Sequence, residues 1–175
     1  MMAEIAGVYA GAVKGGRPFP EPDALQRDRL DYSLASLGEV DRHLKLVRMG
    51  LRRGGDTARS PGIFSRMLSR LAPPHKADEP LRNLAVQAGA YAGEAMRRAA
   101  PRFNWYEIDD VMAERPSLDG RMGEDIEAGG AVLLTPEGEL AAPIGHVAGF
   151  LAGRSEVGIA GYFRRFATGS DEVTP

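Results

Sequence analysis

Apolar residues recur every three or four positions in two long stretches of the chain, and this spacing predicts two amphipathic helices. The first helix is expected to begin at Ser33, whose hydroxyl can cap free backbone N–H groups, and to end before a loop at 53–62. Its core-facing positions are Leu34, Leu37, Val40, Leu44, Val47 and Leu51. Its opposite, solvent-facing side carries Glu39, Asp41, Arg42, Lys45, Arg48 and Arg52.

The second helix is expected over residues 81–100 and should be the central helix of the fold. Ala85, Gly89 and Gly93 recur in it every four residues, so small side chains line one face and another backbone can approach closely. Each glycine costs about 1 kcal/mol of helix propensity relative to alanine, and we expect tight packing to offset this cost. The inward positions are Leu84, Ala85, Ala88, Tyr91, Ala92, Ala95 and Met96.

Weaker patterns predict shorter elements before and between these helices. A helix over 4–13 should end at a glycine pair and lead into a proline-rich connector, and these two pieces make up residues 1–28. A short amphipathic helix over 63–71 should be followed by a second loop at 72–80.

After the second helix the pattern changes to short strands. The aromatic stretch at 103–106 predicts one strand. Ala131–Leu134 and Leu140–Ala142, separated by the turn-forming residues 136–138, predict a β-hairpin. The intervening residues 117–130 are expected to form an acidic, glycine-containing loop.

Two further helices are expected near the end of the chain. Pro143 suits the first position of a helix, and Gly153 suits its end. Ser155 is expected to cap the last helix. That helix should bury Ile159, Tyr162, Phe163 and Phe166.

These elements favour the α+β class, as a mainly helical protein with a small antiparallel sheet or hairpin packed on a central helix. The length of 175 residues fits a single domain. Within it we expect a helical part at 29–100, a strand cluster at 101–142 and C-terminal helices at 143–168.

Composition excludes several classes of protein. The absence of cysteine removes disulfides, thiolate metal sites and thiol nucleophiles. Glu4 lies where a secretory signal would carry a base, and no apolar run approaches the roughly 18–20 residues that span a bilayer. We therefore expect a cytoplasmic protein that does not enter the membrane.

Charge is distributed unevenly, although the formal net charge is only −2. Between 42 and 76 one acid, Asp56, accompanies the bases Arg42, Lys45, Arg48, Arg52, Arg53, Arg59, Arg66, Arg70 and Lys76. Between 107 and 139 two bases, Arg115 and Arg121, accompany the acids Glu107, Asp109, Asp110, Glu114, Asp119, Glu124, Asp125, Glu127, Glu137 and Glu139. The acidic segment could capture a basic partner, or the two segments could neutralise each other across the fold.

No catalytic or cofactor motif is present. His43, His75 and His146 are far apart in sequence and fit no metal-binding spacing. His43 and His146 are expected on helix surfaces or half-buried. The glycines match neither a P-loop nor a dinucleotide fingerprint, and no Gly-x-Ser-x-Gly elbow exists. We expect no cofactor and no metal.

Two alternatives to protein binding stay open. Glu94 with Asp109 or Asp110 could support acid–base chemistry, although adjacent residues of a strand point to opposite faces and Glu94 could instead pair with a neighbouring arginine. The basic segment 42–76 could follow nucleic-acid phosphates, but it has few aromatic residues and the chain has a pI near 6.0.

Several segments together resemble an uncharacterised family of small bacterial domains of unknown function. They are Leu30–Leu37, Gly89–Arg98, Trp105, Pro143–Val147, Gly153 and Tyr162–Phe163, which span roughly residues 30–166. Proteins of this kind are often encoded among bacterial accessory or toxin–immunity genes, so the resemblance implies binding rather than catalysis. It provides no catalytic residues, and the region 53–80 departs from it.

We therefore predict a bacterial accessory or immunity-type protein that binds another protein by surface charge, without catalysis. A toxin or a secretion-system component is the expected kind of partner. The partner-facing acids are expected to be Asp109, Asp110, Glu124, Asp125 and Glu127, and the second patch Arg52, Arg53 and Arg59.

Overall fold

The computed structural model describes residues 1–56, 79–115 and 130–167. Its helices are α1 (Met2–Ala10), α2 (Leu37–Asp56), α4 (Glu79–Ala99), α5 (Ile108–Glu114), α7 (Pro143–Leu151) and α8 (Ile159–Ala167). Two short 3₁₀ turns, Pro22–Ala24 and Arg27–Arg29, lie between α1 and α2. The strands are β1 (Asn104–Glu107), β2 (Ala131–Leu134) and β3 (Leu140–Ala141).

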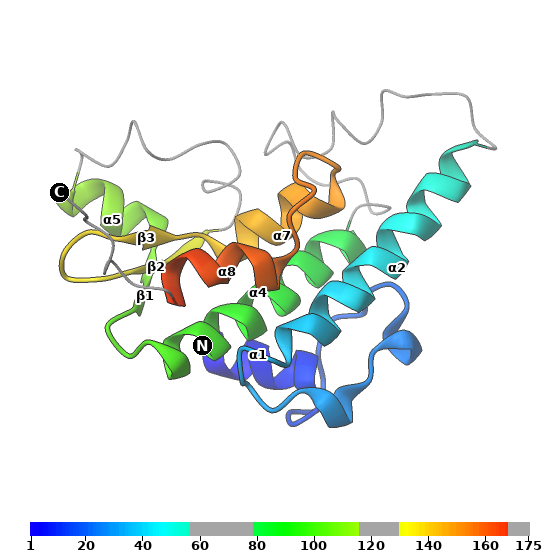
Figure 1. The fold of residues 1–175 in the computed structure, drawn as a ribbon, viewed down its shortest axis with the longest axis horizontal. Coiled ribbons are helices and arrows are strands. Elements are labelled where there is room, and N and C mark those ends of the chain that lie inside the picture. The colour runs from blue at the N-terminus through cyan, green and yellow to red at the C-terminus, as the bar shows by residue number, and fades with distance from the viewer. Residues whose placement is uncertain (57–78, 116–129, 168–175) are drawn as a thin grey trace, which may run out of the picture.

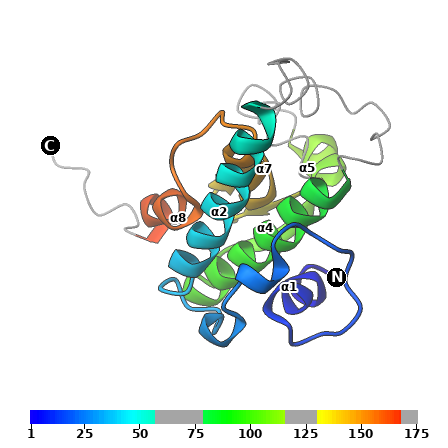
Figure 2. The same ribbon diagram turned by 90° about the vertical axis from the view of Figure 1, so that its right-hand side faces the viewer.

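The central helix is α4, as its pattern of small residues predicts. Figures 1 and 2 show α1 on one side of α4 and α7 on the other, with α2 and α8 covering the same core. A Cβ atom added at Gly89 would lie 2.5 Å from Cα of Ile144 in α7, and one at Gly93 would meet the Trp105 ring at 2.2 Å. Glycine at these two positions therefore lets α7 and β1 pack directly on the backbone of α4.

The strands form one antiparallel sheet in the order β1-β2-β3. Its middle strand, β2, is buried on both faces. Leu133 points into the main core, whereas Val132 and Leu134 join a smaller cluster with Ile108 and Val111 of α5. The mainly helical α+β class is confirmed, as are the hairpin and the strand in the aromatic stretch.

Several predicted boundaries are wrong by a few residues. Helix α1 ends at Ala10 rather than near residue 13, because Gly11 takes the left-handed conformation that closes a helix (φ 77°). Helix α2 begins at Leu37 and not at Ser33. The hydroxyl of Ser33 does accept the Ser36 N–H at 3.2 Å, but it caps a turn that precedes the helix.

Other boundaries differ where a loop was expected. Helix α2 continues through residues 53–56, and α4 already begins at Glu79. The last helix begins at Ile159, and its free N–H groups are capped by Asp41 of α2 instead of by Ser155. The helix predicted over 63–71 and most of the loop predicted at 117–130 lie outside the described residues.

None of the helices among the described residues combines the length and the apolar character needed to cross a bilayer.

Candidate functional site

Of the predicted partner-facing acids, Asp109 and Asp110 lie among the described residues, on the short helix α5. Ile108 and Val111 are buried and hold this short helix against Val132 and Leu134 of the sheet. Their spacing of three residues leaves the other side of α5 to the solvent. Four exposed acids lie there or next to it. They are Glu107, Asp109, Asp110 and Glu114, and we call them the α5 acids.

The α5 acids have no cation partner among the described residues, which is also true of other exposed acids such as Asp23 and Asp28. Among residues 1–56, 79–115 and 130–167, none of the ion pairs includes an α5 acid. By contrast, Glu39, Glu94 and Glu156 each form an ion pair with an arginine at 2.5 Å. The α5 acids therefore present negative charge that the described fold does not neutralise.

Helix stability explains only part of this cluster. Asp109 and Asp110 lie in the first turn of α5, where the positive end of the helix dipole favours an acid. Glu114 is the last residue of α5, where a negative charge is unfavourable.

The acidic surface lies at one end of the molecule. Figure 1 shows α5 and the turn between β2 and β3 at the same end, far from the C-terminal end of α2. This turn adds the exposed Glu137. Glu139, close by, forms an ion pair with Arg102 at 3.3 Å. The exposed acids of α5 and of this turn therefore lie together at one end of the molecule.

The predicted basic patch is only partly described, and it is partly neutralised. The Arg52 side chain is 68% exposed and lies 3.8 Å from the Glu156 carboxylate. The side chain of Arg53 and the whole of Arg59 lie outside the described part, as do the predicted partner-facing acids Glu124, Asp125 and Glu127.

Arg48 was expected on the exposed face of its helix, and this expectation is wrong. Its guanidinium is buried, lies over the Phe150 ring and donates to the Ser155 carbonyl at 3.1 Å and to Glu156 at 2.5 Å. Arg48 therefore holds the segment between α7 and α8 against α2. Glu39 and Asp41, expected on the same exposed face, also make contacts within the fold.

Glu94 does not meet the aspartates with which it could form a carboxylate site. It is buried in α4, and its carboxylate accepts hydrogen bonds from Nε of Arg97 at 2.9 Å and from Nη2 at 2.5 Å. Asp109 and Asp110 are exposed on α5, and no hydrogen bond or ion pair between described residues joins them to Glu94. The geometry supports a structural ion pair at Glu94.

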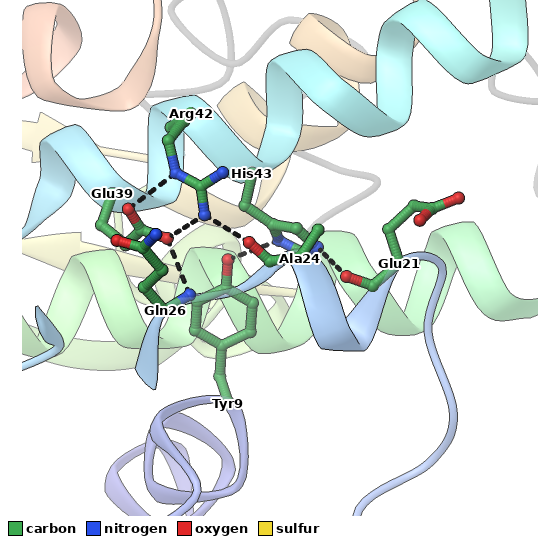
Figure 3. Close-up of polar contacts among 7 residues, drawn as sticks. All are labelled: Tyr9, Glu21, Ala24, Gln26, Glu39, Arg42 and His43. Carbon is green, nitrogen blue, oxygen red and sulfur yellow. Dashed lines mark hydrogen bonds and ion pairs between the residues drawn. The ribbon is translucent and has the colours of Figure 1, made fainter. Parts of the chain in front are cut away.

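His43 is fully buried, where a surface or half-buried position was expected. Figure 3 shows it between Tyr9 of α1 and the connector. Its Nε2 is 3.0 Å from the Glu21 carbonyl and must donate to it, so Nδ1 accepts the Tyr9 hydroxyl proton at 2.9 Å. Burial lowers the pKa of His43 and raises the pKa of Tyr9, so both groups stay neutral.

A second contact beside it fixes the same connector. The Glu39 carboxylate accepts the Gln26 N–H at 2.8 Å and pairs with Arg42, which also donates to the Ala24 carbonyl (Figure 3). Hydrogen bonding by Arg42 lowers the pKa of Glu39. The Tyr9 hydroxyl, both ring nitrogens of His43 and both carboxylate oxygens of Glu39 have partners within the fold, so the network anchors the connector. Sequence patterns missed it because its partners lie far apart in the chain.

His146 has a similar structural role. Its Nε2 lies 2.8 Å from the Val157 carbonyl, and its ring stacks on Tyr162 with centroids 4.1 Å apart. Burial lowers its pKa. Within the described ranges no group of three or more potential ligands could hold a metal ion.

Comparison of the chain with protein-family models, with curated proteins and with solved structures finds no match.

Proposed function

We propose that this chain is a non-catalytic binding protein that docks onto a basic surface of another protein through the α5 acids. The observation that carries the proposal is the exposure of four neighbouring acids that no cation of the described fold neutralises. Like charges held together raise the local potential, which attracts a basic partner and speeds its capture. The resemblance described above supports a bacterial accessory or immunity-type role, with a toxin or secretion-system component as the partner.

Two features of the geometry favour this role over the alternatives. The buried carboxylate of Glu94 is bonded to Arg97, which leaves the enzyme hypothesis without its main residue. Among the described bases of the segment 42–76, Arg42, Arg48 and Arg52 are each paired with a glutamate, and Lys45 is exposed. Neither alternative gains an observation from the structure.

The test is a quantitative capture experiment with charge variants. The wild-type chain and the double variant Asp109→Asn, Asp110→Asn are immobilised and exposed to lysate of the encoding organism at near-physiological salt. We expect a basic protein to be retained by the wild type and to be lost from the double variant. Raising the salt should also release it, because exposed charges are screened beyond about 10 Å at 0.1 M salt.

The matched control is Asp23→Asn, Asp28→Asn, which removes the same charge from two exposed acids in the 3₁₀ turns. This control should retain the partner as the wild type does. If the wild type retains no protein, or if both double variants lose it equally, the proposal is wrong.

A further inference from the structure

The sheet has two edges, and the described residues protect only one of them. The edge at β3 is two residues long, and the next N–H along it, that of Ala142, donates to the Tyr162 hydroxyl of α8 at 2.8 Å. Pro143 follows and has no N–H group. A further strand therefore finds little to pair with at β3.

The edge at β1 carries backbone groups without partners. The Ile108 N–H donates to the Gly130 carbonyl at 3.2 Å, which fixes the phase of the β1–β2 ladder. In that phase Asn104 and Tyr106 exchange hydrogen bonds with β2, whereas Trp105 and Glu107 direct their N–H groups away from it. The two N–H groups and the Trp105 carbonyl have no partner among the described residues.

The side chains around this edge indicate what it could bind. Tyr106 is 41% exposed and lies on the same face of the sheet as its pairing partner Val132, beside the cluster that α5 covers. Glu107 belongs to the edge itself, and Asp109 and Asp110 follow it directly. A second copy of the chain, paired antiparallel here, would bring these like charges together, which is destabilising. The same charges favour a basic strand.

We propose that β1 binds an extended basic segment of a partner protein as a fourth strand of the sheet. The inference rests on the proposed function and names the mode in which the acidic end holds its partner. Backbone hydrogen bonds to Trp105 and Glu107 supply part of the affinity, and the α5 acids select lysine and arginine side chains. Tyr106 supplies an apolar contact beside the added strand.

Glu107 allows a test that separates the backbone from the charge. Its φ of −74° is the value that proline requires, its N–H has no bond in the described fold, and its side chain makes no cap hydrogen bond. Glu107→Pro therefore removes the charge and the edge N–H. The matched variant Glu107→Gln removes the charge alone.

The probe is a fluorescent peptide of alternating lysine and valine, and the readout is its dissociation constant by anisotropy at near-physiological salt. We expect the wild type to bind it and Glu107→Gln to bind more weakly. Glu107→Pro should bind the peptide about fivefold more weakly than Glu107→Gln. This is the ratio of dissociation constants expected when one hydrogen bond worth roughly 1 kcal/mol is lost. The peptide methylated on its backbone nitrogens should lose binding to the wild type, which tests the inference even if the proline variant does not fold.

Three outcomes would overturn strand addition. The first is that Glu107→Gln and Glu107→Pro bind the peptide equally and that the wild type binds the methylated peptide in full. In that case charge alone explains the affinity, and the proposed function stands. The second is no binding of the peptide by the wild type. The third is a dimer of the chain in sedimentation that Glu107→Pro dissociates, because the edge would then serve a second copy.

Discussion

A histidine that is buried without charge makes stability depend on pH, and His43 is such a residue. Its unfolded-state pKa is about 6.5, and burial lowers the folded-state pKa. The unfolded state then binds the proton more readily, so stability is full above about pH 6.5 and is lost as the pH falls toward the folded-state pKa. Protonation would also leave the Tyr9 hydroxyl proton without its acceptor.

We expect the free energy of unfolding of the wild type, measured in urea, to fall between about pH 7.5 and about pH 5.5. The variant His43→Gln should show a smaller fall. Because burial lowers the pKa of His146 as well, adding His146→Gln should remove much of the remainder. At pH 7.5 His43→Gln alone should lower the free energy of unfolding by about 1–3 kcal/mol, since it disturbs a buried hydrogen bond. An unchanged pH dependence in the double variant would contradict this account.

Gly89 allows a test of how closely α7 packs on the backbone of α4. In Gly89→Ala the new Cβ would lie 2.5 Å from Cα and 2.8 Å from N of Ile144, atoms that a rotamer change cannot move. Overpacking costs about 1–3 kcal/mol, and the gain in helix propensity returns about 1 kcal/mol. We expect urea unfolding to show a net loss of up to about 2 kcal/mol.

Gly50→Ala is the matched control, because Gly50 also lies inside a helix but has nothing within 4 Å of its added Cβ. This variant should gain up to about 1 kcal/mol. Equal gains at both positions would mean that α7 does not pack on the α4 backbone.

At the scale of elements, α2 organises the segment that joins α7 to α8. Asp41 accepts the N–H groups of Ile159 and Ala160 at 2.6 and 3.3 Å, so α2 caps the start of α8. Two turns further along α2, the Arg48 guanidinium donates a hydrogen bond to the Ser155 carbonyl. Burial raises the pKa of Asp41 despite these bonds, which shows that its desolvation outweighs them.

Removing this cap should release α8 more than the rest of the fold. Asp41→Ala is expected to cost about 1–2 kcal/mol in urea unfolding and to speed hydrogen exchange in α8 first. Gly158→Ala places a Cβ 2.4 Å from the Asp41 carboxylate and should disrupt the same contact, so the two substitutions should be less than additive. Lys45→Ala, an exposed change one turn away, should stay within about 0.5 kcal/mol. Full additivity of the pair would argue against the cap.

At the scale of the whole molecule, the sequence predicted what depends on local periodicity. The small residues of α4, the inward positions of α2 and the hairpin are all present because each pattern repeats within one element. The polar residues of α2 were misplaced for the opposite reason. Asp41 and Arg48 have the spacing of an exposed face, but their partners lie 118 and 107 residues away. Of the candidate site, the α5 acids could be found from charge, whereas the free edge of β1 required the register of the sheet.

The register also shows why the described elements should unfold together. Alternate residues of β2 enter different clusters, Leu133 the main core and Val132 the cluster under α5, so neither cluster can open without exposing the other side of the same strand. Trp105, the sole tryptophan, packs its ring on Gly93 of α4 and so reports on the contact between sheet and helices.

We therefore expect Trp105 fluorescence and far-ultraviolet circular dichroism to give one urea midpoint, because the first follows the sheet and the second mostly the helices. The variant Val132→Ala tests the coupling. It removes buried volume from the smaller cluster at a cost of about 1–3 kcal/mol, and it should lower both midpoints equally. A fluorescence midpoint that falls while the helical signal stays would show that the sheet and α5 form a separate unit. The acidic end could then open on binding without disturbing the helices, and a single cooperative domain would be the wrong description.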